Sequence, residues 1–117
     1  MLNAPADKEV LVRKQQELGD RFIRRSLVDV RHILDNLQVE AVLSQPQTMA
    51  DLYALAHRLV GTAATLGFHE LSDQAAELEL QLAAIANSAT HAADNLHSIA
   101  ARVLDEISRL ARDRAIV

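Results

Sequence analysis

Residues 48–80, TMADLYALAHRLVGTAATLGFHELSDQAAELEL, decide the fold of this chain. Their apolar residues recur at steps of three and four, which predicts two amphipathic helices. Gly67 and Phe68 separate these helices, and glycine readily adopts the left-handed conformation with which many helices end. We therefore expect a helical hairpin over about residues 48–87, with its second helix beginning near His69.

His57 lies in the middle of the first helix of the hairpin but away from its apolar stripe. At about 100° per residue, it points roughly 140° from the centre of that stripe. Gly61 and Ala64 follow one and two turns later, so little side-chain bulk stands beside the imidazole. A glycine inside a helix costs ~1 kcal/mol relative to alanine. Gly61 therefore indicates either room for another molecule at His57 or a close helix–helix crossing. The stripe comprises Leu52, Ala56, Leu59, Ala63 and Leu66.

The two helices of the hairpin differ in how clearly their ends are marked. The first has two candidate capping boxes, Thr48 with Asp51 and Ser44 with Gln47, and the sequence does not decide between them. For the second helix, a turn at residues 87–90 marks the end. Its expected core stripe is Leu71, Ala75, Leu78, Leu82 and Ile85.

Periodicity outside the hairpin predicts two more long helices. Residues 1–6 should be a frayed tail, followed by a weakly amphipathic helix that either bends near Gly19–Asp20 or continues. The chain is expected to fray again over Arg112–Val117. We predict an all-α, antiparallel up-and-down four-helix bundle with a short N-terminal helical extension. The expected seams are Ile23, Leu27, Val30, Leu34, Leu37 and Ala41 in one helix, and Leu96, Ile99, Val103, Ile107 and Leu110 in the other.

Composition supports a single helical domain over residues 1–117. Half of the residues are hydrophobic but only 3% are aromatic, which is typical of closely packed helices. The net charge of −4 argues against nucleic-acid binding. No cysteine is present, so disulfides and thiolate chemistry are excluded. No apolar run approaches the ~18 residues of a membrane span, and Met1–Val10 lacks a signal-peptide core. We expect a cytoplasmic protein that does not enter a membrane.

The run HRLVGTAATLG, from His57 to Gly67, resembles the His-x-Leu-Lys-Gly-x-Ala/Ser-x-x-x-Gly signature of histidine phosphotransfer (HPt) domains. These domains are the helical phosphocarriers of two-component phosphorelays, and the resemblance implies the same bundle fold. It departs from the signature at Val60, where the family usually has lysine. Similarity to the family's Leu…Ala/Cys…Leu-Glu pattern continues at Leu71, Ala75, Leu78 and Glu79.

Glu79 is the expected partner of His57. His57 lies ten residues before Gly67 and Glu79 twelve after it, so an antiparallel hairpin places them at similar heights. A phosphocarrier needs a largely neutral imidazole, whose unperturbed pKa is about 6.5, with Nε2 free and the proton held on Nδ1. The resemblance implies this orienting role as well, because Glu or Gln often occupies the same offset in HPt domains. A solvated Glu79 without contact to His57 is the alternative.

The other parts of a phosphotransfer site are missing from the sequence. There is no Gly-rich phosphate loop, carboxylate cluster for Mg²⁺ or nucleotide motif. We therefore expect a phosphocarrier rather than an enzyme, with no cofactor or metal of its own. The resemblance implies that a partner receiver domain supplies the aspartate and Mg²⁺. The expected partners are response-regulator receiver domains and a hybrid sensor kinase, which bind a monomer.

Docking of a partner is expected around His57. Val60 cannot supply the positive charge of the family's lysine, Arg58 projects about 100° round from His57, and residues 59–101 contain no Lys or Arg. Arg21, Arg24 or Arg25 could compensate only if packing brings one of them near. The expected docking residues are Tyr53, Arg58, Val60, Gly61 and Ala64.

Two functional hypotheses remain. In the first, His57 accepts a phosphoryl group from a receiver aspartate and passes it to another receiver. In the second, which the Val60 departure motivates, the chain is a non-phosphorylated helical adaptor that docks a receiver or a sensor kinase.

Overall fold

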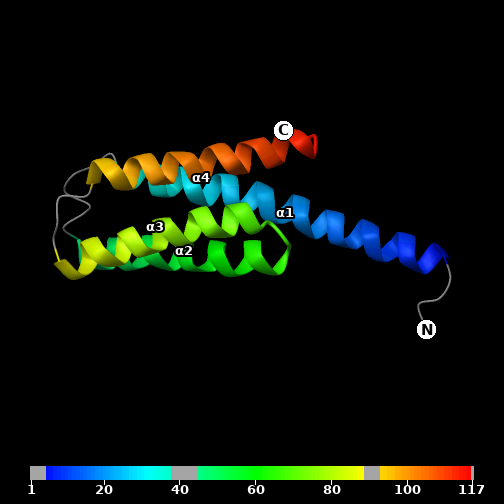
Figure 1. The fold of residues 1–117 in the computed structure, drawn as a ribbon, viewed down its shortest axis with the longest axis horizontal. Coiled ribbons are helices and arrows are strands. Elements are labelled where there is room, and N and C mark those ends of the chain that lie inside the picture. The colour runs from blue at the N-terminus through cyan, green and yellow to red at the C-terminus, as the bar shows by residue number, and fades with distance from the viewer. Residues whose placement is uncertain (1–4, 38–44, 89–92, 117) are drawn as a thin grey trace.

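The computed structural model describes residues 5–37, 45–88 and 93–116, and these form four helices joined in up-and-down order (Figure 1). The helices are α1 (Pro5–Leu37), α2 (Pro46–Thr65), α3 (His69–Ser88) and α4 (Ala93–Asp113). The predicted all-α antiparallel four-helix bundle is therefore confirmed. No helix in the described ranges is long and apolar enough to cross a membrane.

The bundle consists of two helix pairs. α2 packs along α3 and α1 packs along α4, while contact between α3 and α4 joins the pairs. Contact between α1 and α2 is much sparser. The molecule measures 57 × 27 × 20 Å, because the N-terminal part of α1 projects well beyond the other helices (Figure 1).

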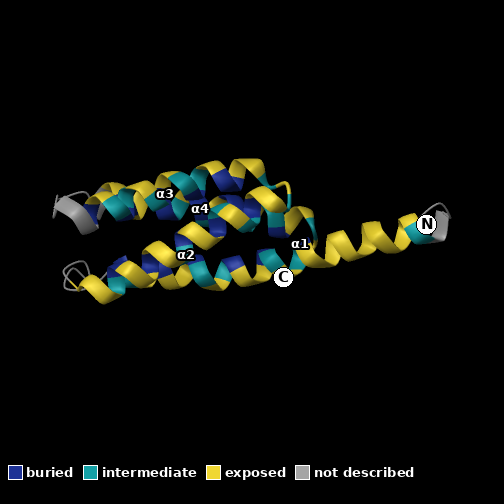
Figure 2. Cartoon of the chain, turned by 90° about the horizontal axis from the view of Figure 1, so that it is seen from below, coloured by how far each residue is buried: buried dark blue, intermediate teal, exposed yellow. Residues whose placement is uncertain are grey.

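α1 is not interrupted at Gly19–Asp20. It is one helix of 33 residues, and the predicted N-terminal extension is its projecting part. Residues 8–18 are all exposed, and this part of α1 is drawn almost entirely in the exposed colour in Figure 2. Gly19 leaves room for the guanidinium of Arg114, because a Cβ at this position would lie only 2.8 Å from Nη1 of Arg114.

The core follows the predicted stripes with small rotations. In α1, Ile33 is buried whereas Leu27 and Leu34 are only half-buried, so the buried face is turned slightly from the predicted seam. Ala41 lies outside the described residues. All five predicted stripe residues of α3 are buried. Met49 joins the buried face of α2, while Leu66, which follows the last residue of α2, and Leu110 of α4 are half-buried at the edge of the core.

The prediction that Thr48 and Asp51 form a capping box at the start of α2 is wrong. The N-cap is Gln45, three residues before Thr48, and the helix begins at Pro46, whose fixed φ and missing N–H suit the first turn of a helix. The Thr48 hydroxyl lies 3.1 Å from Oε1 of Gln45. Ser44, of the competing box, lies outside the described residues.

The end of α2 agrees with the sequence. Gly67 has φ +86°, the left-handed conformation expected of it. The N–H of Phe68 bonds the carbonyl of Ala63 at 2.8 Å, and the N–H of Gly67 bonds that of Ala64 at 3.2 Å. These bonds satisfy the last carbonyls of the helix and reverse the chain into α3.

The predicted fraying of residues 112–117 is wrong for the part that the structure describes. Ile116 is buried, and its N–H bonds the carbonyl of Ala111 at 2.8 Å. Arg114 pairs with Asp20 at 2.9 Å and lies over the ring of Phe68, 4.9 Å from its centroid. The C-terminal turn is thereby held against α1 and the α2–α3 corner at the point where α1 leaves the bundle.

Candidate functional site

His57 lies on the solvent side of α2. The core-facing residues of this helix are Met49, Leu52, Ala56, Leu59 and Ala63, and the imidazole points away from them. Its side chain is 69% exposed. A reacting group on another molecule can therefore reach the ring without any movement of the bundle.

Glu79 on α3 contacts His57 as the residue counting predicts. Oε2 of Glu79 lies 2.9 Å from Nδ1 of His57, and the Glu79 side chain is only 22% exposed. A carboxylate can only accept a hydrogen bond, so Nδ1 is the donor and carries the proton. This contact leaves the lone pair of Nε2 on the outer edge of the ring. The histidine is thus held in one orientation and one tautomer.

Tyr53 lies one turn before His57 on the same side of α2. The two rings are nearly parallel, with an interplanar angle of 12° and a centroid separation of 6.1 Å. Tyr53 is 37% exposed. It therefore gives His57 an aromatic neighbour and still presents apolar surface to solvent.

Gly61 leaves open space beside His57. A Cβ at this position would meet no atom within 4 Å, and Gly61 and Ala64 are both exposed. The alternative that Gly61 marks a close helix–helix crossing is therefore wrong. The Thr65 hydroxyl donates a hydrogen bond to the Gly61 carbonyl, one turn earlier in the helix, at 2.9 Å.

Ser72 joins α2 to α3 near the site, and the sequence interpretation did not single it out. Its hydroxyl donates to the carbonyl of Val60 at 3.0 Å, and Ser72 is 8% exposed. The same counting from Gly67 that pairs His57 with Glu79 also brings these two residues close in height. Val60 is half-buried beside this contact, so its side chain lies partly within the α2–α3 contact.

Arg58 is directed away from the His57 face, toward α1. Packing brings it together with Arg21 and Arg25, but not with Arg24, around a groove of about 510 Å³ between α1 and α2. One side of α2 thus carries the histidine and the other carries positive charge. The groove, called the α1–α2 groove below, is lined by Leu18, Arg21, Phe22, Arg25, Ser26, Asp29, Leu55, Arg58, Leu59, Thr62 and Leu66.

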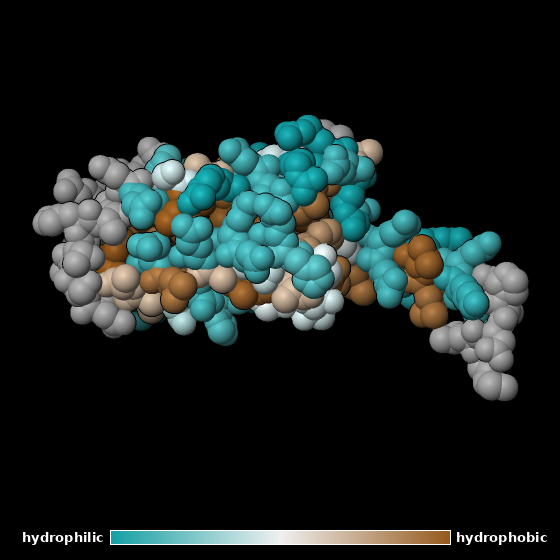
Figure 3. All heavy atoms as spheres, viewed as in Figure 1, coloured by the Kyte–Doolittle hydropathy of each residue, from teal (hydrophilic) through white to brown (hydrophobic). Residues whose placement is uncertain are grey.

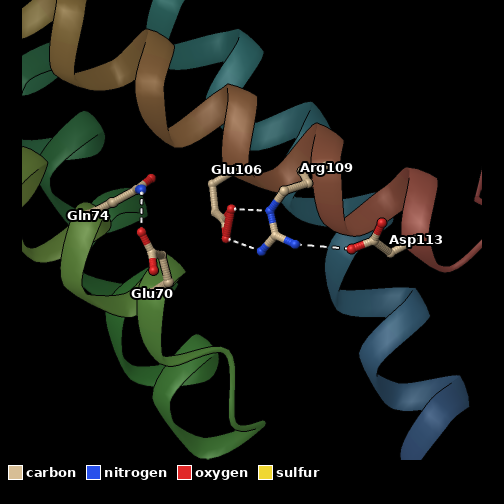
Figure 4. Close-up of polar contacts among 5 residues, drawn as sticks. All are labelled: Glu70, Gln74, Glu106, Arg109 and Asp113. Atoms are coloured by element: carbon tan, nitrogen blue, oxygen red, sulfur yellow. Dashed lines mark hydrogen bonds and ion pairs between the residues drawn. The ribbon is translucent and has the colours of Figure 1, made fainter.

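A second group of polar side chains lies on α4 and faces Glu70 and Gln74 of α3 (Figure 4). Arg109 donates through Nε and Nη2 to the two oxygens of Glu106, both at 2.7 Å, and through Nη1 to Asp113 at 3.0 Å. The hydrogen bonds that Arg109 donates to Glu106, together with the negative charge of Glu106, raise the pKa of Arg109. Glu106 is 8% exposed, and a buried carboxylate needs such a partner. Across from this pair, Gln74 contacts Glu70 at 3.4 Å.

The groups needed to hold a metal do not gather anywhere in the described ranges. No three His, Asp or Glu side chains there are placed to bind one ion. The described part of the chain therefore offers one candidate site, with an exposed, oriented imidazole and an open approach.

A comparison with protein families agrees with this geometry. The model of the Hpt domain matches residues 21–113, which contain all four helices except the projecting part of α1. The chain belongs to the Hpt domain family. No curated protein and no solved structure gives a significant match.

Membership of the Hpt family carries functional consequences. Hpt domains are phosphocarriers, so this chain has a histidine phosphotransfer role in a phosphorelay. Proteins of the family interact with receiver domains and kinases. The matched range includes His57, Glu79 and the residues around them.

Proposed function

We propose that this Hpt domain accepts a phosphoryl group on Nε2 of His57 from the aspartyl phosphate of a receiver domain and passes it to the aspartate of another. The observation that supports this most strongly is the 2.9 Å contact between Glu79 and Nδ1 of an imidazole that is 69% exposed. An oriented tautomer with its nucleophilic nitrogen open to solvent is what a phosphocarrier requires.

In the proposed step, the lone pair of Nε2 attacks phosphorus on the receiver's aspartyl phosphate. The N–P bond forms as the bond between phosphorus and the aspartate oxygen breaks, and the aspartate leaves as a carboxylate. The proton on Nδ1 stays on the ring, which gains positive charge. Glu79 stabilises that charge from 2.9 Å. Onward transfer is the same exchange in reverse, with the new aspartate as nucleophile.

The partner completes the chemistry. Transfer of a phosphoryl group depends on positioning and on neutralising the charge of its oxygens. We expect Mg²⁺ held by the receiver to supply that neutralisation, since the described residues of this chain gather no metal ligands. The chain contributes the nucleophile, its orienting carboxylate and a docking surface of Tyr53, Val60, Gly61 and Ala64. On this proposal it is a phosphocarrier and not an enzyme.

A second candidate function is a helical adaptor that docks a receiver or kinase without carrying phosphate. Val60 favours it, because the positive charge that the family usually places one turn after the histidine is absent. Arg58, Arg21 and Arg25 line the α1–α2 groove, on the other side of α2 from His57, and so do not replace that charge. An adaptor would bind its partner equally well without the imidazole.

Incubation with a receiver carrying radiolabelled phosphate separates the two candidates. The wild type should become labelled in an acid-labile form, and His57→Gln should remain unlabelled. His69→Gln is the matched control, because His69 is an exposed histidine at the start of α3, and it should be labelled like the wild type. Equal labelling of the wild type and His57→Gln contradicts the proposal. If the wild type stays unlabelled, and both it and His57→Gln still bind the receiver, the result supports the adaptor.

A further inference from the structure

α3, the helix that carries Glu79, packs against α2 and α4. Hydrophilic residues cover much of the face that α3 and α4 present to solvent (Figure 3). An ion pair of 3.3 Å between Glu77 and Arg102 joins α3 to α4, but both side chains are about half exposed, and such a pair holds two helices only weakly. Among the polar contacts of α3, those with α2 are therefore the ones that can fix the height of Glu79 relative to His57.

Ser72 makes such a contact from a buried position. Its hydroxyl donates to the carbonyl of Val60 at 3.0 Å, and the residue is 8% exposed, so water has little access to this bond. The His57 side chain is 69% exposed, and water does compete for its contact with Glu79. A hydrogen bond shielded from water is stronger than one open to it. The bond of Ser72 is thus the more persistent of the two.

Ser72 and Glu79 lie on the same flank of α3. They are seven residues apart, which is about two turns, and Ala76 lies between them with only a methyl group, which makes no hydrogen bond. On α2, Val60 follows His57 by one turn. The two hydrogen bonds therefore join the same pair of helices along one seam. A shift or tilt of α3 along this seam changes both distances together.

We infer that Ser72 is a positioning residue for phosphotransfer through His57. Its bond to the Val60 carbonyl holds α3 at the height at which Glu79 reaches Nδ1 of the imidazole. Ser72 bonds the backbone of α2 rather than the imidazole, so it acts through Glu79. The functional consequence rests on the proposed phosphotransfer, whereas the positioning itself can be measured on the protein alone.

Nitrogen NMR of the protein without a partner tests the positioning. At a pH where the imidazole of His57 is neutral, the wild type should carry the ring proton on Nδ1. Ser72→Ala should move part of the population to the Nε2–H tautomer, because fewer molecules make the contact with Glu79. Ser26→Ala is the matched control, since Ser26 is a serine of α1 that is 2% exposed, and it should leave the His57 signals unchanged. An unchanged tautomer in Ser72→Ala, or the same shift in Ser26→Ala, overturns the inference.

Rates of labelling by a phosphorylated receiver test the functional consequence. Ser72→Ala should slow labelling of His57 by roughly two- to tenfold, as expected for the loss of one ordinary hydrogen bond. In a Glu79→Ala background the same change should have no further effect, because Ser72 acts through that carboxylate. Equal slowing by Ser72→Ala in both backgrounds contradicts the inference.

Failure of this inference and failure of the proposed function give different results. A wild type that is not labelled contradicts the proposed function, and the tautomer of Ser72→Ala then still decides the positioning. A labelled wild type with the same rate and tautomer in Ser72→Ala contradicts the inference alone. Circular dichroism should show native helix content in each variant. Ser72→Cys repeats both measurements with a side chain of similar size that donates only a weak hydrogen bond, and it should change them in the same direction.

Discussion

The carboxylate of Glu79 lies 2.9 Å from Nδ1 of His57, although 22 residues separate them in the chain. The α2–α3 corner produces this contact, because Gly67 reverses the chain at a point that leaves both residues at one height. Glu79 is mostly buried while His57 is mostly exposed, so the acceptor is fixed by packing and the nucleophile remains free to react.

Replacing Glu79 should remove the hydrogen bond that holds the proton of His57 on Nδ1, so that both tautomers of the imidazole are populated. A hydrogen bond to a charged group contributes about 1.5–3 kcal/mol, so Glu79→Ala should slow phosphoryl transfer by roughly ten- to hundredfold. Nitrogen chemical shifts of the ring should then show a mixture of tautomers. Glu79→Gln retains an acceptor oxygen and should lose less. The control is Glu77→Ala, which removes a carboxylate that pairs with Arg102 on α4; a similar loss in this variant would show that the effect is not specific to the His57 contact.

We expect Gly61 to lower the stability of the bundle while keeping the His57 ring accessible to a partner. Because a Cβ there meets nothing within 4 Å, Gly61→Ala should raise the free energy of unfolding by about 0.5–1 kcal/mol. Gly61→Gln should keep part of that gain but slow transfer, since its side chain enters the space beside the imidazole. Chemical denaturation and transfer rates measure the two effects. Ser98→Gln adds the same side chain at an exposed position of α4 and should leave transfer unchanged, whereas equal rates for Gly61→Gln and the wild type would disprove a role in access.

Restoring the family's usual lysine should strengthen the site. Val60 is half-buried, and a lysine there can keep its stem against α3 while its ammonium group reaches solvent near His57. We expect Val60→Lys to speed transfer or to prolong the phosphorylated state, because a positive charge near the phosphoryl oxygens stabilises them. Time courses of labelling and of phosphohistidine decay measure both. Val60→Met controls for the change in side-chain length, and unchanged kinetics in the lysine variant would mean that another group already supplies the charge.

The effect of Gly19→Ala on the free energy of unfolding should depend on whether Arg114 is present. Gly19→Ala alone should destabilise the bundle or leave it unchanged, because its Cβ would lie 2.8 Å from the Arg114 guanidinium and displace it from Asp20. In an Arg114→Ala background the same change should stabilise, by up to ~1 kcal/mol, since alanine is the better helix former. A double-mutant cycle of unfolding free energies checks this. Additive effects would show that the two residues do not share this space.

Much of the hairpin could be predicted because its signals are local. The steps of three and four fix which faces of α2 and α3 are buried, and the left-handed Gly67 fixes where the chain turns. Given those two facts, the heights of His57 and Glu79 follow from the constant rise of a helix. The start of α2 was missed because proline at the first turn competes with the capping box, and local rules do not rank the two.

The sequence by itself determined the bundle, the outward direction of His57 and the carboxylate within reach of it, because helix periodicity and rise depend only on the chain's own spacing. Only the tertiary structure decided the length of α1 and its contacts with the other helices. Its continuation past Gly19, the pairing of Arg114 with Asp20, and the gathering of Arg21, Arg25 and Arg58 around one groove all join residues from different helices. Such contacts depend on how whole helices pack against one another, and no local pattern of residues specifies that packing.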